Sequence, residues 1–248
     1  MVIRQGETTL NHPFQSVDPV MKYLIVNGDD FGASPGINLG IMEAHHRGIL
    51  TSTSLLVKAE RSEEAAALGR SAPNLSVGLH ADLLSELERP AVGSQGLRES
   101  LCSQLSRFEE LMGRLPTHLD SHHNVHLNPQ VLPVFLELAR KHGLPLRGNW
   151  PVRYFSKFYG QWGGRTHLEQ ISVEKLASMI ETEIGEGFTE LSCHPGHVDA
   201  NHHTTYSIER EAELRTLCDQ RIRDALSEQA IRLISYHDFA KLSMNGSS

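Results

Sequence analysis

Short runs of apolar and β-branched residues alternate with longer amphipathic segments along most of the chain. Turn residues bound these runs, which have the length of buried strands. Seven of them are expected to form strands of one sheet: YLIVN (23–27), STSLLV (52–57), LSVGLH (75–80), THLDSH (117–122), LPLRG (144–148), TELSCH (189–194) and IRLISY (231–236).

The segments between the runs carry apolar positions at helical spacing. In the first segment, Ser34 can cap and Pro35 can open a helix over roughly 36–47. Two ranges, 81–97 and 149–170, lack a clear period and are expected to be long loops, which are often functional in compact domains. Further helices are expected within 60–72, 97–113, 128–143, 172–187 and 207–229.

Strand and helix alternate without a Pro-, Gly- or Ser-rich linker that would divide the chain. This order predicts an α/β fold in which a parallel sheet closes, or nearly closes, into a β/α barrel. A doubly wound open sheet is the alternative. We expect one domain over 21–243, with a loose N-terminal extension at 1–20 and a flexible tail at 244–248.

Composition narrows the function classes. The net charge is −7, with 30 acidic against 23 basic residues and no long basic run, so we expect no nucleic-acid partner. The three cysteines are far apart, which argues against a thiolate zinc site and a disulfide framework. The sequence shows neither a secretion signal nor a membrane span, so a cytoplasmic setting is expected.

Histidine is unusually abundant, with 15 residues that cluster rather than scatter. The segment HLDSHHNVH (118–126) alone holds four histidines and one aspartate, which is hard to explain as a solvated surface. Polar side chains of this kind end most of the predicted strands: Asp29 and Asp30, His80, Asp120, His122 and His123 with His126 just after, Arg147, and His194.

The C-terminal ends of parallel barrel strands form one rim, where the active sites of this architecture are built. Two imidazoles and a carboxylate are a common ligand set for a catalytic divalent metal, and Asp30, His80 and His122 are the candidates. Neighbours on a strand point in opposite directions, so one aspartate would bind metal and the other would act as base. Taken alone, the Asp29–Asp30 pair is also an ordinary turn sequence.

Several motifs resemble, in order and spacing, those of the YdjC-like carbohydrate deacetylases. The resemblance covers roughly residues 21–242. It departs from the family pattern at Asn124, which breaks the usual run of three histidines, and in the segment after His80. The motifs are LIVNGDDFGASPGINLGIMEAHHRGILTSTSLLV, VGLHADL, PTHLDSHHNVHLNPQVLPVFLELARKHGLPLR, FYGQ, ELSCHPGHVD and LISYHDF.

The resemblance implies a distorted TIM-like barrel of about seven parallel strands and removal of an acetyl group from an N-acetylated sugar, such as a chitooligosaccharide. It further implies a divalent metal, usually magnesium, with zinc or manganese as alternatives. Asp29 corresponds to the catalytic base, and the metal ligands correspond to Asp30, His80 and His122. Homodimers are common in the family.

On this basis Asp29 is expected to activate a metal-bound water and His194 to protonate the leaving nitrogen. Arg147 would keep Asp29 ionised by an ion pair. Asp120 and His126 would orient the metal ligands through outer hydrogen bonds. A swap of roles between the two aspartates would leave the sequence unchanged.

The sequence leaves open both the substrate and two alternative functions. Tyr159 and Trp162, in the aromatic segment 154–162, could stack on sugar rings or could simply pack on the barrel. A metal-dependent phosphoesterase is the alternative enzyme, although it usually gathers two metals and more carboxylates. A sugar-binding barrel without catalysis is the non-enzymatic alternative.

Overall fold

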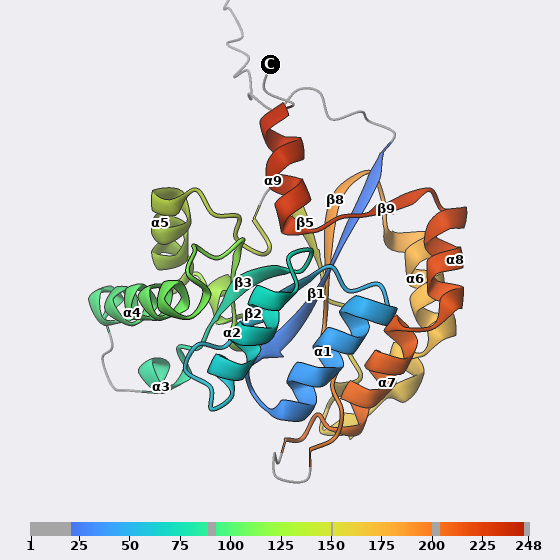
Figure 1. Ribbon diagram of the computed structural model, residues 1–248, viewed down its shortest axis with the longest axis horizontal. Helices are drawn as coiled ribbons and strands as arrows, with labels where there is room; N and C mark the ends of the chain where they lie inside the picture. The colour runs from blue at the N-terminus through green and yellow to red at the C-terminus, as the bar shows by residue number, and fades with distance from the viewer. Residues whose placement is uncertain (1–20, 89–92, 150, 200–203, 246–248) are drawn as a thin grey trace, which may run out of the picture.

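The computed structural model describes residues 21–88, 93–149, 151–199 and 204–245. Its centre is a parallel sheet of seven strands, and helices pack around the outside of the sheet (Figure 1). The strand order is β4-β3-β2-β1-β8-β5, and β9 also pairs with β1. The sheet curls into a distorted TIM-like barrel, which confirms the predicted fold class.

Strand β1 (Lys22–Phe31) is the central strand. β8 (Gly187–Cys193) pairs along one edge, whereas β9 (Ile231–Leu233) and β2 (Ser52–Leu55) share the other edge. Strand β1 therefore joins the strands on its β2 side to those on its β8 side. The remaining strands of the sheet are β3 (Ser76–Ala81), β4 (Leu119–Ser121) and β5 (Val152–Phe155).

Helix α1 (Pro35–Arg47) begins as predicted, because Ser34 Oγ accepts a hydrogen bond from the Ile37 N–H at 3.2 Å. None of the helices in the described residues has the length and apolarity needed to cross a bilayer. The other elements are α2 (Ser62–Ser71), α3 (Leu84–Leu87), α4 (Ser94–Met112), η1 (His122–Leu127), α5 (Leu132–His142), β6 (Gln161–Trp162), β7 (Arg165–Thr166), η2 (Leu168–Ile171), α6 (Val173–Glu183), α7 (Ile208–Leu217), α8 (Gln220–Glu228) and α9 (Tyr236–Asn245).

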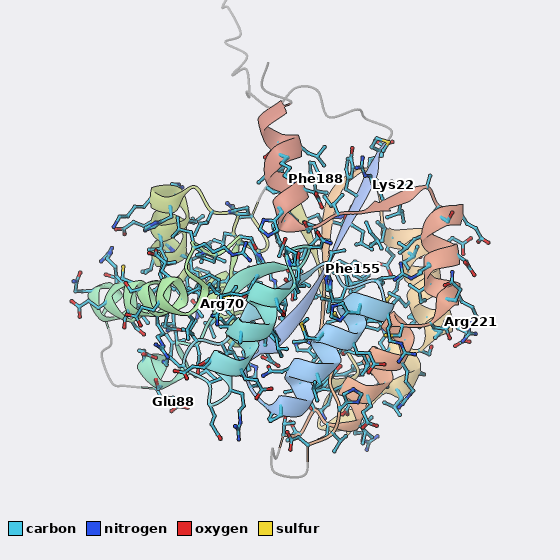
Figure 2. All side chains as sticks on the ribbon, viewed as in Figure 1. Lys22, Arg70, Glu88, Phe155, Phe188 and Arg221 are labelled. Atoms are coloured by element: carbon cyan, nitrogen blue, oxygen red, sulfur yellow. The ribbon has the colours of Figure 1, made fainter. Side chains whose placement is uncertain are left out.

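An apolar cluster fills the end of the barrel at which the strands begin. Tyr23 and Ile25 of β1 belong to it, and α9 contributes Phe239, whose ring meets Phe188 edge-on at 5.0 Å. Figure 2 shows Lys22 and Phe188 at this end of the sheet, with Phe188 beside α9. The helix therefore closes the base of the barrel and leaves the C-terminal rim for the site.

Two sequence predictions about strands were wrong. The segment 144–148 makes only one isolated bridge, Leu119 to Leu146, and is not a strand. The range 149–170 is not simply a loop, because it contains β5, the β6–β7 hairpin and η2. The chain thus crosses from the edge of β4 to the edge of β8 between positions 146 and 152.

Helix boundaries also differed from the predictions. The single helix expected over 207–229 is two helices, α7 and α8, because Asp219 caps a new helix by accepting from the Arg221 N–H. Helix α9 was not predicted, and it extends into the expected tail as far as Asn245. The expected N-terminal extension, 1–20, and the end of the tail, 246–248, lie outside the described residues.

Candidate active site

A β-bulge brings both aspartates of the DDFG motif to the rim. Asp29 and Asp30 lie within β1, and the register against β2 shifts between Gly28 and Phe31. Asp30 takes the left-handed conformation, with φ of 70°, which an aspartate tolerates better than most residues. The extra residue breaks the strict alternation of the strand, so both carboxylates can face the same cavity.

That cavity has a volume of about 500 Å³ and opens at the C-terminal rim. Its floor is formed by polar groups from four strands and from η1, while aromatic residues of the later loops form a wall. The residues that line it are Asp29, Asp30, His80, His122, His123, Asn124, Tyr154, Ser156, Phe158, Tyr159, Ser192, His194, Thr204, Thr205, Tyr206 and Arg210.

The three predicted metal ligands lie together at the floor of the cavity. One oxygen of Asp30, Oδ1, is 3.4 Å from His80 Nε2 and 3.2 Å from His122 Nδ1. The three ligand atoms all lie within 4.8 Å of one another. Asp30 Oδ1 is buried and has no hydrogen-bond partner among the described residues, so it offers a lone pair that a cation could satisfy.

A short contact joins His80 to Asp120. His80 Nδ1 lies 2.6 Å from Asp120 Oδ1, which leaves Nε2 directed toward Asp30. Although burial opposes protonation, the nearby carboxylates of Asp120, Asp29 and Asp30 raise the pKa of His80 to about 10. A neutral His80 carrying its hydrogen on Nδ1 would present a free Nε2 lone pair, the form that binds a metal.

Arg147 is buried among three carboxylates. Its guanidinium forks onto Asp29, with Nη1 2.8 Å from Oδ2 and Nη2 2.6 Å from Oδ1. Nη2 is also 2.7 Å from Asp120 Oδ2, and Nε donates to Glu190 at 2.8 Å. Burial would raise the pKa of Asp29, but Arg147 and His80 together outweigh burial and hold that pKa below its usual value.

His194 lines the same cavity and lies close to Asp29. Its Nε2 is 3.9 Å from Asp29 Oδ2, and its Nδ1 is buried without a hydrogen-bond partner in the described part of the chain. The rings of Tyr159 and Tyr206 meet the imidazole edge-on at 5.6 and 5.5 Å. Burial lowers the pKa of His194 to about 4, although Asp29 and Asp30 oppose this.

Two of the remaining predicted site residues contact other groups. His126 Nδ1 lies 2.6 Å from Ser121 Oγ, and His126 Nε2 lies 3.2 Å from the carbonyl oxygen of Arg147. His126 therefore supports the backbone at Arg147 and does not contact a candidate metal ligand. Trp162 stacks on His167 at 3.6 Å and is half exposed, away from the residues that line the cavity. Tyr159 lines the cavity.

Sequence reasoning missed three charged residues that support the site. Glu190 holds Arg147, while Arg210 and Glu213 of α7 contact Asp30 and the His194 backbone. A signal existed for Glu190, since it is four residues before His194 in the predicted strand 189–194 and would therefore share its face. The sequence gave no such signal for Arg210 and Glu213 of α7, because charged residues on a helix normally indicate a solvated face.

The arrangement suits hydrolysis assisted by one cation. A buried carboxylate–imidazole–imidazole set fits a divalent metal such as Mg²⁺, Mn²⁺ or Zn²⁺. Asp29 is adjacent to that set yet held by Arg147, so its carboxylate is ionised and placed to accept a proton. A second set of possible ligands consists of Asp29, His80 and Asp120. The Arg147 guanidinium already lies between the two carboxylates of this set.

Known proteins share both the sequence and the fold of this chain. A carbohydrate deacetylase of Geobacillus stearothermophilus is 36% identical, and the alignment covers 89% of this chain and 99% of that protein. A chitooligosaccharide deacetylase of Escherichia fergusonii is 35% identical over 88% of this chain and 99% of that protein. The chain therefore matches both relatives over nearly their full lengths.

Solved structures agree with this relationship. One from Enterococcus faecalis, described as a candidate cellobiose-phosphate cleavage protein, has a TM-score of 0.77 and 30% identity and covers 88% of this chain and 99% of that one. A family 4 carbohydrate esterase of Streptomyces lividans, in complex with acetate, shares the fold, with a TM-score of 0.55, 14% identity, and coverage of 86% and 91%. The family model described as "YdjC-like protein" matches residues 23–228, and the chain belongs to that family.

Proposed function

We propose that this protein is a carbohydrate deacetylase that hydrolyses the acetamide of an N-acetylated sugar with the help of one divalent cation. One observation carries the proposal above the others. The carboxylate of Asp29 is held ionised beside the Asp30–His80–His122 set, and His194 Nε2 lies 3.9 Å from it. The deacetylase names of the two relatives support the same reaction.

Amide hydrolysis needs an activated water, stabilisation of the oxyanion and a proton for the leaving nitrogen. A cation held by Asp30, His80 and His122 would supply Lewis acidity toward the acetyl carbonyl and the water. Asp29 accepts the proton that the water loses as its oxygen bonds to the carbonyl carbon. Arg147 fixes the direction of the Asp29 carboxylate through two hydrogen bonds.

His194, which is neutral before the reaction, takes up this proton from Asp29 and delivers it to the nitrogen as the carbon–nitrogen bond breaks, which gives acetate and a free amine. Its Nε2 lies 3.9 Å from Asp29 Oδ2, so the proton taken from water has a short path to the leaving nitrogen. The edges of Tyr159 and Tyr206 limit where the imidazole can turn. General acid–base assistance of this kind is worth roughly 10²- to 10⁴-fold in rate.

The position of Arg147 favours this reaction over a two-metal phosphoesterase. A second cation would need the carboxylates of Asp29 and Asp120, yet one guanidinium nitrogen lies 2.6 Å from the first and 2.7 Å from the second. A fixed positive charge between these carboxylates leaves one cation site in this cluster. A phosphatase panel run beside an acetate-release assay tests the distinction, and turnover of phosphate esters alone would reject the deacetylase proposal.

The decisive test uses Asp29→Asn with a panel of N-acetylated mono-, di- and trisaccharides and several divalent metals. We expect acetate release to fall by about 10³-fold or more, because the amide cannot accept the proton of the water. Metal binding, followed by calorimetry, should persist because this substitution leaves the ligand set intact. Full activity in this variant would exclude Asp29 as the base.

His122→Ala provides the complementary test of the ligand set. This variant should lose metal occupancy and acetate release together, since it removes one of three ligands while Asp29 and Arg147 remain paired. His123→Ala, which changes the neighbouring histidine outside that set, is the matched control for metal binding. Wild-type metal affinity in His122→Ala would remove His122 from the proposed site.

A further inference from the structure

Arg210 of α7 lies beside the candidate cation site. Its Nη2 donates to Asp30 Oδ2 at 2.5 Å, and its Nε donates to the carbonyl of Tyr206 at 3.1 Å. Its Nη1 points at the carbonyl of His194 at 3.5 Å. The side chain is almost fully buried, so one guanidinium joins the end of β1 to the segment that follows β8.

The two oxygens of Asp30 therefore have different surroundings. Oδ1 faces His80 and His122 and lacks a hydrogen-bond partner within the described ranges, whereas Oδ2 is taken by Arg210. A carboxylate in this position can offer one oxygen to a cation, because two-oxygen coordination would require the guanidinium to leave. The positive charge of Arg210 also opposes a cation bound nearby and draws electron density away from Asp30.

Helix α7 additionally holds the backbone of His194 from both sides. The Glu213 carboxylate accepts a hydrogen bond from the His194 N–H, and Arg210, one turn earlier on the helix, approaches the His194 carbonyl. The carbonyl of Arg210 accepts from the Gly196 N–H at 3.2 Å. A shift of Asp30 is thus linked through Arg210 to a shift of His194.

We propose that Arg210 is a positioning residue that restricts Asp30 to one-oxygen coordination and fixes the cation site relative to His194. The inference rests on the proposed deacetylase function and deepens it. A merely structural residue would change cation affinity and turnover in the same direction, whereas a positioning residue changes them in opposite directions. Arg210 lowers the affinity for the cation and raises the turnover that the cation supports.

Arg210→Gln tests the separation. Removal of a positive charge beside the site should tighten Mn²⁺ or Zn²⁺ binding by roughly three- to tenfold, as measured by calorimetry without substrate. Acetate release should fall by about tenfold or more in kcat, because Asp30 and His194 lose their shared anchor. Weaker metal binding in this variant, or an unchanged kcat, would overturn the proposal.

Arg210→Lys separates charge from geometry and also serves if the glutamine variant does not fold. Lysine keeps the charge, so the metal dissociation constant should stay within about threefold of wild type. A single ammonium cannot reproduce the fork between Asp30 and the Tyr206 and His194 carbonyls, so kcat should still fall. Full kcat with lysine would show that charge alone suffices and would reject the positioning role.

Arg215→Gln is the matched control, because it removes the same charge from an exposed position on the same helix. Both metal affinity and kcat should match the wild type in this control. The metal titration needs no substrate, so it tests Arg210 even if the wild type releases no acetate. Absence of acetate release from every sugar would instead count against the proposed function.

Discussion

At the scale of single residues, the site depends on one arginine that pairs with three buried carboxylates. Arg147 reaches Asp29, Asp120 and Glu190 at 2.6 to 2.8 Å while fully buried. Buried charges are expensive unless they are paired and hydrogen-bonded, so these contacts must be satisfied together. The Tyr236 hydroxyl donates to the other oxygen of Glu190 at 2.6 Å and completes the network.

Arg147→Lys should reduce both stability and activity. One ammonium cannot fork onto Asp29 and also reach Asp120 and Glu190, which leaves at least one buried carboxylate without a cationic partner. Loss of a partner in a buried ion pair costs about 3 kcal/mol or more, and urea denaturation should show a decrease of this order. Acetate release should fall by about tenfold or more, because the direction of Asp29 is no longer fixed.

Arg98→Lys is the control for that change, since Arg98 forks onto Glu137 on the exposed surface of α4. Its free energy of unfolding and its activity should be those of the wild type. If Arg147→Lys behaved like this control, the three buried carboxylates would not depend on the guanidinium.

Much of the candidate site could be predicted from the sequence, because the C-terminal ends of parallel barrel strands meet at one rim. Asp30, His80 and His122 are far apart in the chain, and the common rim of parallel strands brings them together. The bulge that turns Asp29 and Asp30 to the same side was not predictable, since it depends on the register against β2. Arg210 escaped notice because burial of a helical charge is a tertiary property.

At the scale of elements, helix α1 seats the segment that carries His194. Glycines at two positions let the backbone of that segment lie directly on the helix. A Cβ at Gly40 would meet Gly196 Cα at 2.4 Å, and one at Gly36 would meet the His197 carbonyl oxygen at 2.5 Å. The His197 N–H donates to the Gly36 carbonyl at 3.0 Å, which fixes the contact. Figure 1 shows α7 beside α1, so the segment after β8 is held by both helices.

Gly40→Ala should displace that segment. Overpacking of this kind costs about 1 to 3 kcal/mol, and the backbone of Gly196 has no flexible side chain that could move away. We expect a corresponding loss in the free energy of unfolding and a decrease in kcat of about tenfold, because His194 is two residues from the contact. Gly185→Ala is the control, since its Cβ would meet only the Arg153 guanidinium at 3.6 Å. Wild-type kcat in Gly40→Ala would show that the contact does not position His194.

Helices and strands were predicted correctly where the local sequence pattern was strong. They were missed where the backbone conformation depends on tertiary contacts. The helix over 36–47 was predicted because Ser34 and Pro35 signal its start in the sequence. β5 was missed because VRYF lies in an aromatic segment without a clear period, and its strand conformation depends on pairing with β8. α9 was missed because it is defined by its packing into the base of the barrel.

At the scale of the whole molecule, the barrel interior changes from apolar at its base to polar at its rim. Along β8 the inward residues run from Phe188 through Glu190 to Ser192, and His194 follows directly after the strand. His118 lies near the boundary, fully buried, with its ring stacked on Tyr236 at 3.9 Å. The polar upper half therefore contains ionisable groups that the fold must hold in one charge state.

His118 is held neutral. Its Nδ1 is 2.9 Å from Thr117 Oγ1, and its Nε2 has no hydrogen-bond partner among the residues that the structure describes. Burial lowers the pKa of His118 to about 3; the carboxylate of Asp120 opposes the shift, and the charge of Arg147 adds to it. Protonation of the folded protein at this position would place an unsatisfied charge inside the barrel.

This predicts a specific loss of stability in mild acid. Between pH 6.5 and 3 the unfolded chain binds a proton at His118 that the folded protein does not bind, so the free energy of unfolding falls as the pH falls. The slope from this residue is at most about 1.4 kcal/mol per pH unit, or about 2 kcal/mol between pH 6.5 and 5. Urea denaturation at intervals of half a pH unit measures it.

His118→Phe keeps a ring for Tyr236 to stack on and removes the titration. Its stability should depend less steeply on pH than that of the wild type between pH 6.5 and 5, whatever its absolute value at pH 7. His126, whose pKa burial lowers to about 4, contributes a slope of the same sign that remains in the variant. His46→Gln, at an exposed position of α1, is the control and should keep the wild-type slope. Equal slopes in His118→Phe and the wild type would mean that the folded barrel accepts a proton at His118.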